Sequence, residues 1–205
     1  MGARPGDPIG RPSRPMCPDC GRPVAVCWCP YAQFVATAHR IVVLQHPREQ
    51  RRALGSVRIL RRVLANVVVC VGVEFSDDPD VAAALADDDR DAVFLYPRAG
   101  LAPFDLRAAR RPLTMFVVDG TWTQARSLRA ANPWLEDLPY ARLSPATPSV
   151  YGVCAQPGAE SLCTLEAVAH ALAIAEDNDA VRRVLVRPLR ALAKFHLLSI
   201  TESRH

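Results

Sequence analysis

Four cysteines near the amino end of the chain have the spacing of a metal site. They follow a C-x2-C…C-x-C pattern made by Cys17, Cys20, Cys27 and Cys29. Four thiolates in so short a window can surround Zn²⁺ tetrahedrally, and Gly21 and Pro23 permit the turn that this requires. With every ligand position filled, the pattern predicts a structural zinc knuckle holding about one zinc per chain. A redox pair is the alternative, although no thioredoxin-like βαβ context surrounds the cluster.

A second candidate site lies where the apolar run Val117-Val118 meets Asp119. Gly120 then turns the chain, and Thr121 with Gln124 has the spacing of a capping box that opens a helix. Capping alone is sufficient to explain Thr121. A carboxylate at the tip of a buried strand suits a general base, so Asp119 is the candidate catalytic residue. Trp122 is either core packing or a platform on which a base or adenine stacks.

Short apolar runs alternate with amphipathic stretches and must position these residues. The runs are continuous and β-branched, as in strands buried on both faces of a parallel sheet. The predicted strands are Ile41–Leu44, Val67–Val73, Val93–Tyr96, Leu113–Val118 and Tyr140–Leu143. The predicted helices are Arg48–Ala65, Asp80–Ala86, Thr121–Ala131, Thr164–Glu176 and Asp179–Ile200, the last containing Pro188. This order predicts an α/β fold with a mostly parallel sheet and helices on both faces.

Four of the predicted strands run directly into polar or turn-forming residues. These tips are Gln45-His46-Pro47, Tyr96-Pro97, Asp119-Gly120 and Ser144-Pro145. Ligands of open α/β sheets bind outside the carboxyl ends of the strands, so we expect the site at this edge.

Composition describes one globular unit with a short appendage. The chain has 205 residues, is 50% hydrophobic and carries a net charge of +4. It is large enough to fold without disulfides, and its apolar content excludes a wholly disordered chain. Residues 1–15 are rich in Pro, Gly and Arg and are predicted to be a disordered tail. No apolar run approaches the ~20 residues of a membrane span and no signal-peptide core is visible, so we expect a cytoplasmic protein with no membrane partner.

The basic residues are all arginines except Lys194. Arginine binds phosphate bidentately and stacks on bases, which is compatible with a nucleic-acid partner, although coding bias explains the excess equally well. Six arginines fall on the predicted helix 48–65, largely away from its apolar stripe: Arg48, Arg51, Arg52, Arg58, Arg61 and Arg62. We expect this group to contact an RNA backbone. A second candidate group is Arg182, Arg183, Arg187 and Arg190.

Five ordered blocks give the chain a resemblance to the DTW-domain family. They are the four-cysteine knuckle, Leu44-Gln45-His46-Pro47-Arg48-Glu49, Leu95-Tyr96-Pro97, Asp119-Gly120-Thr121-Trp122 and Thr164-Leu165-Glu166-Ala167-Val168. The resemblance implies a tRNA-uridine 3-(3-amino-3-carboxypropyl)transferase that uses S-adenosylmethionine. It also implies a SPOUT-like fold with a C-terminal trefoil knot. The expected division is the tail 1–15, a zinc knuckle over 16–36 and a DTW catalytic domain over 37–205.

The resemblance also suggests roles for individual residues. The residues expected to line the cofactor pocket are Thr121, Trp122, Tyr151, Thr164, Leu165 and Glu166. The residues expected to bind the tRNA substrate are His46 and Glu49, together with Arg51, Arg52 and Arg58 from the charge pattern. Structural roles compete for three of these residues: a hydrogen bond at a strand end for His46, and helix stabilisation for Glu49 and Glu166.

Two positions depart from the family pattern. Cys163 stands where relatives usually have a Ser that caps a helix, which leaves Ser161 or Thr164 as substitute caps. Relatives also tend to carry an Arg shortly after the tyrosine, where this chain has Tyr151-Gly152-Val153-Cys154. These departures keep open a non-catalytic zinc-knuckle protein that binds RNA. RNA methyl transfer from the same cofactor also stays open, because sequence chemistry alone does not separate it from aminocarboxypropyl transfer.

Overall fold

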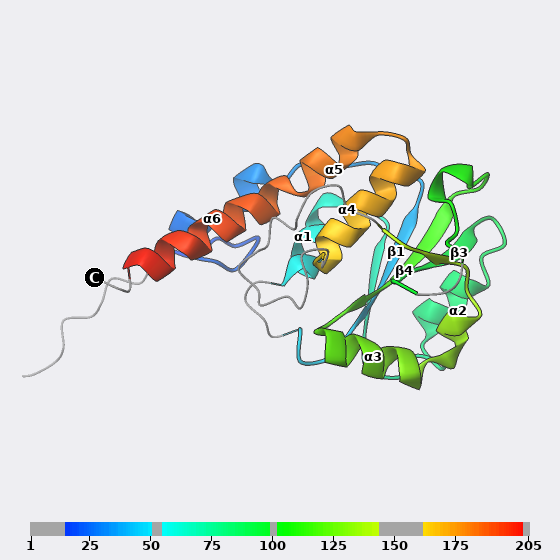
Figure 1. Ribbon diagram of the computed structural model, residues 1–205. Helices are drawn as coiled ribbons and strands as arrows, with labels where there is room; N and C mark the ends of the chain where they lie inside the picture. The colour runs from blue at the N-terminus through cyan, green and yellow to red at the C-terminus, as the bar shows by residue number, and fades with distance from the viewer. Residues whose placement is uncertain (1–14, 51–54, 99–101, 144–161, 203–205) are drawn as a thin grey trace, which may run out of the picture.

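The computed structural model describes residues 15–50, 55–98, 102–143 and 162–202, with side chains up to residue 195. Its centre is a five-stranded sheet in the order β2-β1-β4-β3-β5, and every pairing is parallel (Figure 1). The strands are β1 (Arg40–Gln45), β2 (Val67–Val71), β3 (Asp91–Leu95), β4 (Leu113–Asp119) and β5 (Tyr140–Ala141). The predicted α/β fold with a parallel sheet is confirmed.

Helices cover both faces of the sheet. One face carries α1 (Ser56–Val63), α4 (Thr164–Ala175), α5 (Asp179–Leu185) and α6 (Arg187–Glu202). The other face carries α2 (Pro79–Leu85) and α3 (Trp122–Ala131), with the short 3-10 turn η4 (Pro133–Glu136). Figure 1 shows α6 extending beyond the sheet on the first side.

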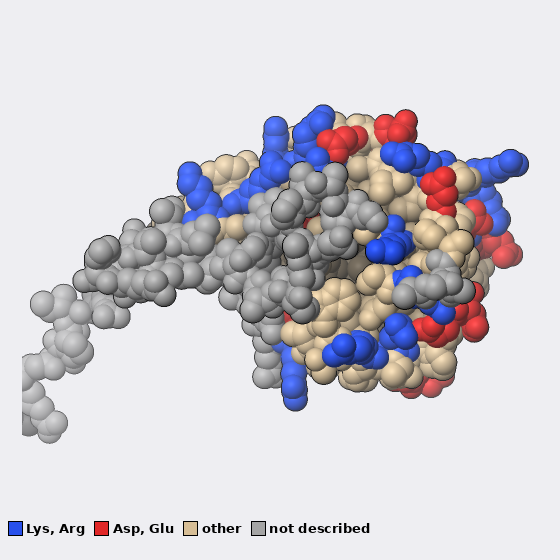
Figure 2. Space-filling view, viewed as in Figure 1, with Lys and Arg blue, Asp and Glu red and all other residues tan. Residues whose placement is uncertain are grey.

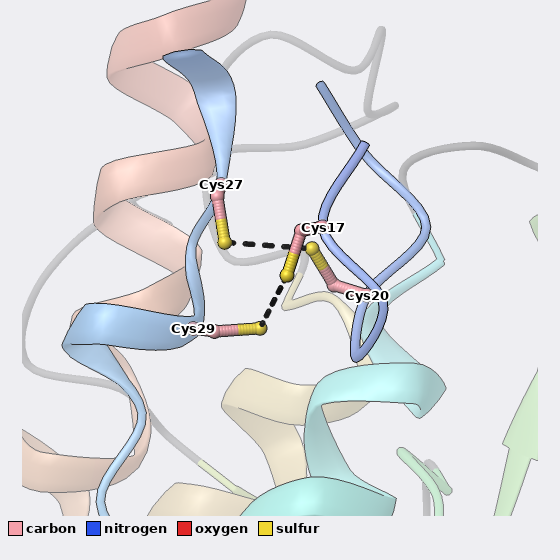
Figure 3. Close-up of side chains that lie close together, drawn as sticks. All are labelled: Cys17, Cys20, Cys27 and Cys29. Carbon is pink, nitrogen blue, oxygen red and sulfur yellow. Dashed lines mark hydrogen bonds between the residues drawn. The ribbon is translucent and has the colours of Figure 1, made fainter. Parts of the chain in front are cut away.

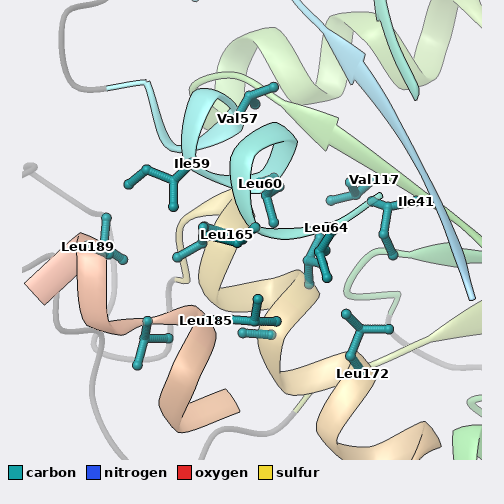
Figure 4. Close-up of a cluster of buried hydrophobic side chains, with 14 of the residues drawn as sticks. Ile41, Val57, Ile59, Leu60, Leu64, Val117, Leu165, Leu172, Leu185 and Leu189 are labelled. Carbon is teal, nitrogen blue, oxygen red and sulfur yellow. The ribbon is translucent and has the colours of Figure 1, made fainter. Parts of the chain in front are cut away.

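Strands β1 and β4 are apolar on both faces because both faces are covered. Side chains alternate across a strand, so Ile41 and Val43 join the cluster under α1 and α4, whereas Val42 and Leu44 join the cluster under α2 and α3. Figure 4 shows part of the first cluster, in which Leu60 of α1 and Leu172 of α4 lie on the same side of the sheet as Ile41 and Val117. Burying each such side chain contributes about 1.5–3 kcal/mol.

The prediction of a helix from Arg48 is wrong at its amino end. Residues 47–50 form a turn, and α1 begins only at Ser56, with Gly55 as N-cap. The backbone N–H of Arg48 donates to Nδ1 of His46 at 3.2 Å, and that of Glu49 donates to the His46 carbonyl at 2.9 Å. The backbone N–H groups of Arg48 and Glu49 are therefore bonded within a turn, and neither is bonded as in a helix. Arg48 therefore does not lie on the helix, and Arg51 and Arg52 fall outside the described residues.

The single helix predicted from Asp179 is two helices, separated at Val186. Pro188 lies in the first turn of α6. Proline has no N–H and clashes with the carbonyl four residues earlier, so it is accommodated in a first turn and breaks a helix interior. Two strands are also shorter than predicted, since β2 ends at Val71 and β5 at Ala141.

The cysteine-containing segment packs onto the main core. It contains the 3-10 turns η1 (Val24–Val26) and η2 (Cys29–Tyr31). Cys17, Cys20, Cys27 and Trp28 belong to the same hydrophobic cluster as α1 and α6. Arg62 of α1 also pairs with Asp19 at 3.6 Å. Within the part of the chain that the structure describes, no helix has the length and apolar character needed to cross a bilayer.

Candidate active site and four-cysteine cluster

Asp119 lies at the carboxyl end of β4, beside the last residue of β1. The parallel register places Gln45 opposite Asp119, and Nε2 of Gln45 donates to Oδ2 of Asp119 at 2.8 Å. Both side chains are buried, Asp119 being 8% exposed. Gln45 was not among the predicted site residues. The sequence placed it at a polar strand tip on the expected site edge, but its pairing with Asp119 depends on the register between β1 and β4.

The other oxygen of Asp119 is held by a helix that follows much later in the chain. Oγ1 of Thr164, the first residue of α4, donates to Oδ1 of Asp119 at 2.5 Å. This bond brings the predicted catalytic residue together with a predicted cofactor-binding residue. Each carboxylate oxygen has further lone pairs, so Asp119 can still accept a proton or a hydrogen bond from a ligand.

The turn after Asp119 is tightly constrained. Thr121 is the N-cap of α3, and both halves of the predicted capping box with Gln124 are present, at 2.6 and 3.3 Å. A Cβ on Gly120 would stand 2.9 Å from Cβ of Gln124, so only glycine fits there without displacement. The N–H of His46 donates to the carbonyl of Asp119 at 3.0 Å. The β1 and β4 tips are thus joined by backbone as well as side chain.

Cys163 itself is the N-cap of α4. The N–H of Cys163 donates to Oε2 of Glu166 at 3.0 Å, which is the glutamate half of a capping box. The suggestion that Thr164 substitutes as the cap is wrong, because its hydroxyl is bonded to Asp119. Ser161 lies outside the described residues. Glu166 is only 3% exposed, and burial together with this carboxylate raises the pKa of the Cys163 thiol.

Aromatic rings form a short stack beside the site. Trp122 opens α3 and meets the ring of Tyr96 edge-on, with centroids 6.4 Å apart. Tyr96 in turn stacks on Phe94 at 5.2 Å and lies under the guanidinium of Arg129. Trp122 is half-buried against the second core cluster. Core packing is therefore part of its role, and the stacking platform stays a prediction.

The remaining predicted residues are less closely grouped. Leu165 is fully buried in the core, so its side chain faces the core and not an open site. Glu49 lies in the turn after His46. Arg58 is exposed on α1 and forms no ion pair with any residue whose position is described. Tyr151, Arg51 and Arg52 lie outside the described residues.

The four predicted metal ligands converge in space. Figure 3 shows their sulfur atoms pointing toward one another, from the loop that carries Cys17 and Cys20 and from the segment that carries Cys27 and Cys29. The sulfurs of Cys17 and Cys29 are 3.9 Å apart, those of Cys20 and Cys27 are 3.7 Å apart, and all four lie within 4.8 Å of one another. Sulfurs bound at about 2.3 Å in a tetrahedron stand roughly 3.8 Å apart, so the donor set fits Zn²⁺.

Local backbone geometry prepares this cluster. Gly21 adopts a left-handed φ of 66°, and its N–H donates to the carbonyl of Cys17 at 2.9 Å. Hydrogen bonding from the backbone at Cys20, followed by the Cys27 thiol, lowers the pKa of Cys17 to about 7. Burial raises the pKa of Cys27 and Cys29. A cation would favour the thiolate form of all four.

Together the fold and the site define an α/β protein with a buried carboxylate at the carboxyl edge of a parallel sheet and a four-cysteine module on one flank. The DTW domain matches residues 14–197, and the chain belongs to the DTW domain family. No solved structure gives a significant match.

Curated relatives carry a consistent name. The chain is 35% identical over 191 residues to "tRNA-uridine aminocarboxypropyltransferase 2" of Mus musculus, covering 90% of this chain and 64% of that protein. The protein of the same name in Drosophila melanogaster is 36% identical over 199 residues, covering 93% of this chain and 78% of that one. "tRNA-uridine aminocarboxypropyltransferase A" of Arabidopsis thaliana is 26% identical over 213 residues, covering 89% of this chain and 81% of that protein. The chain thus spans slightly less than two thirds of the mouse protein's length.

Proposed function

We propose that this chain is a tRNA-uridine aminocarboxypropyltransferase, which attaches the 3-amino-3-carboxypropyl group of S-adenosylmethionine to N3 of a tRNA uridine. The observation that carries the proposal is the bond between Thr164 and Asp119. It joins the Asp-Gly-Thr-Trp and Thr-Leu-Glu motifs in one place, at the strand edge where α/β sheets bind ligands. The names of the relatives supply the reaction class.

The residues at this edge fit the co-substrate chemically. When bound, S-adenosylmethionine supplies a carbon made electrophilic by the neighbouring sulfonium. Glu166 is a buried carboxylate suited to an ammonium group, and the amino ends of α3 and α4 favour a carboxylate. Thr121, Trp122, Tyr151, Thr164 and the backbone at Leu165 complete the pocket that we propose.

Asp119 is the proposed general base. N3–H of uridine is weakly acidic, and a carboxylate within hydrogen-bond reach accepts that proton as N3 bonds to the carbon. The carbon–sulfur bond breaks and methylthioadenosine leaves. Gln45 and Thr164 hold both oxygens of Asp119, so the carboxylate is oriented before substrate arrives. The uracil must be unstacked to enter, which favours a nucleotide in a tRNA loop.

We assign the proposed tRNA contacts to His46, Glu49, Arg51, Arg52 and Arg58. The charge pattern supports the arginines, and Arg58 is exposed with no ion-pair partner among the residues described. Contacts of this kind position RNA through its phosphates without reading sequence.

Two further features belong to the proposal. Cys17, Cys20, Cys27 and Cys29 hold a structural Zn²⁺, supported by sulfur spacing close to a tetrahedral edge. A C-terminal trefoil knot of the SPOUT type follows from the resemblance and stays a prediction. The division into tail, knuckle and catalytic domain also stays a prediction.

The decisive experiment is mass spectrometry of nucleosides from unmodified tRNA incubated with the protein and S-adenosylmethionine. We expect uridine carrying an aminocarboxypropyl group, with methylthioadenosine as the small product. Methylated uridine with adenosylhomocysteine would assign methyl transfer instead. No modified nucleoside, together with no heat of S-adenosylmethionine binding by calorimetry, would leave a non-catalytic RNA-binding protein.

A further inference from the structure

A groove lies between the cysteine module and the last helix, apart from the residues assigned to catalysis. Its volume is about 470 Å³, within the range of sites that hold small organic ligands. One wall is the segment around η2, and the other is α6. The lining residues used below are Tyr31, Arg187, Arg190, Lys194 and Phe195.

The groove is strongly basic. Arg187, Arg190 and Lys194 are exposed on one side of α6, and none forms an ion pair with a residue in the described part of the chain. Arg182 and Arg183 on α5 differ, since both pair with Asp179, at 2.7 and 2.8 Å. Figure 2 shows Lys and Arg side chains gathered along the part of the surface where Figure 1 draws α5 and α6. Three uncompensated cations in one groove favour an anionic ligand.

The same groove presents an aromatic surface. Tyr31 is 49% exposed. The apolar ring of a tyrosine is commonly packed against other residues of the same protein unless a partner covers it. The Tyr31 ring meets that of half-buried Phe195 edge-on, with centroids 6.3 Å apart and an interplanar angle of 62°. This contact orients the tyrosine ring and leaves part of it accessible.

We infer that this groove binds a single-stranded segment of the tRNA substrate. A base stacks on Tyr31, and the adjoining phosphates contact Arg187, Arg190 and Lys194. Aromatic platforms beside cationic tracks are the common way in which proteins hold single-stranded RNA. The chain's own amino-terminal tail is a poor occupant, because residues 1–14 carry three arginines against one aspartate. The identity of the RNA as tRNA rests on the proposed function.

The inference also gives the cysteine module a role in recognition. Cys29, one of the four clustered cysteines, is the first residue of η2, and Tyr31 is the last. Any ion that fixes Cys29 therefore fixes the turn that presents Tyr31. The module then forms one wall of an RNA site as well as stabilising the fold.

The test compares binding of unmodified tRNA by fluorescence anisotropy, without S-adenosylmethionine, at two salt concentrations. We expect R187Q/R190Q/K194Q to weaken binding at least about tenfold and to reduce the salt slope by roughly 2, near 0.7 per lost phosphate contact. Y31A should weaken binding about tenfold, whereas Y31F, which keeps the ring, should bind as wild type does. Zinc content and melting temperature verify that each variant is folded.

A matched control removes the same charge elsewhere. Arg107, Arg110 and Arg111 are exposed in the segment before β4, at the amino end of the strands. Arg107 pairs with Asp177 and Arg111 with Asp91, so this triple removes the same formal charge from a surface where two of the three cations are already compensated. R107Q/R110Q/R111Q should weaken binding much less than the groove triple. Equal losses of tRNA affinity in the two triple variants, or wild-type affinity in Y31A, would overturn the proposal that the groove binds RNA. The proposal would also be wrong if the groove substitutions weakened binding to anionic lipid vesicles but not binding to tRNA.

The design separates this inference from the proposed function. If the wild-type protein transfers no group to tRNA but the groove variants bind tRNA more weakly than wild type, the proposed transferase is refuted and the proposed groove stands. If the wild-type protein modifies tRNA and the groove variants bind tRNA normally, only the proposed groove is refuted.

Discussion

The Thr164 hydroxyl donates a 2.5 Å hydrogen bond to Oδ1 of Asp119, joining the first turn of α4 to the end of β4 across 45 positions of sequence. Gln45 holds the second oxygen from the neighbouring strand. Two distant parts of the chain, the end of β1 and the start of α4, thus hold one buried carboxylate. Each can be changed independently, and this makes the site testable.

Replacing Asp119 by Asn tests the base. Asn has nearly the same volume, its oxygen can still accept from Thr164, and its amide N–H can donate to Oε1 of Gln45 once that amide turns over, so the fold should survive. Asn cannot take the uridine proton. We expect kcat to fall by about 10²–10⁴, measured as modified nucleoside formed per unit time, with little change in melting temperature. Full turnover by D119N would eliminate Asp119 as the base.

Thr164 is expected to act by positioning Asp119. T164V removes the hydroxyl and leaves Oδ1 short of a donor, which should lower the free energy of unfolding by about 1–3 kcal/mol. It should also lower kcat with little change in KM, because the Asp119 carboxylate is no longer held in position by the Thr164 hydroxyl. T164S retains the hydroxyl and should restore both. A T164S variant as impaired as T164V would show that packing of the methyl group is what matters.

Metal analysis tests the four-cysteine cluster. Protein purified without chelator should contain about one zinc per chain, and removal of the metal should lower the melting temperature because metal binding is coupled to folding. C20S should lose the metal. C163S, which removes a cysteine outside the cluster, should retain it. Metal-free protein with an unchanged melting temperature would contradict the assignment.

The cap of α4 offers a stabilising substitution. Sulfur is a weak acceptor, whereas a serine hydroxyl is among the preferred N-caps, so C163S should raise the free energy of unfolding by about 0.5–1 kcal/mol. Chemical denaturation measures this directly. Unchanged or lower stability would mean that the half-buried site favours the thiol over the hydroxyl.

One buried histidine, His39, and one half-buried histidine, His170, should make the protein acid-sensitive. Burial lowers the pKa of His39, with Arg90 adding to this and Glu176 opposing it; burial and then Arg182 lower that of His170. Nδ1 of His39 accepts the N–H of Leu113 at 2.9 Å and must be unprotonated to do so. Below an ordinary pKa of about 6.5 the unfolded chain binds more protons, so stability is greatest above that pH and falls as pH drops toward the folded pKa.

The loss should not exceed about 1.4 kcal/mol per pH unit for each histidine. H39N keeps an acceptor for Leu113 and should flatten the slope between pH 7 and 5, and H39N/H170N should flatten it further. Unfolding free energies measured by denaturant across this range provide the comparison. An unchanged slope in the double variant would place the acid sensitivity elsewhere.

Local patterns in the sequence were sufficient for many features. The strands were predictable because a strand buried on both faces must be apolar throughout, as Val42 and Val43 are. The capping box at Thr121 was predictable because its two bonds span only three residues. The cysteine cluster followed from spacing that confines the four sulfurs to a small volume.

Only the tertiary structure decided the features that depend on distant parts of the chain. Pairing of β1 with β4 placed Gln45 beside Asp119, and docking of α4 placed Thr164 there. Likewise, packing of α6 against η2 set Tyr31 beside cations more than 150 residues later. The helical pattern of the sequence predicted that the first helix begins at Arg48, whereas the Arg48 N–H donates to Nδ1 of His46 in a turn. Sequence periodicity reports which side chains need burial, whereas contacts between distant segments arise only when the layers pack.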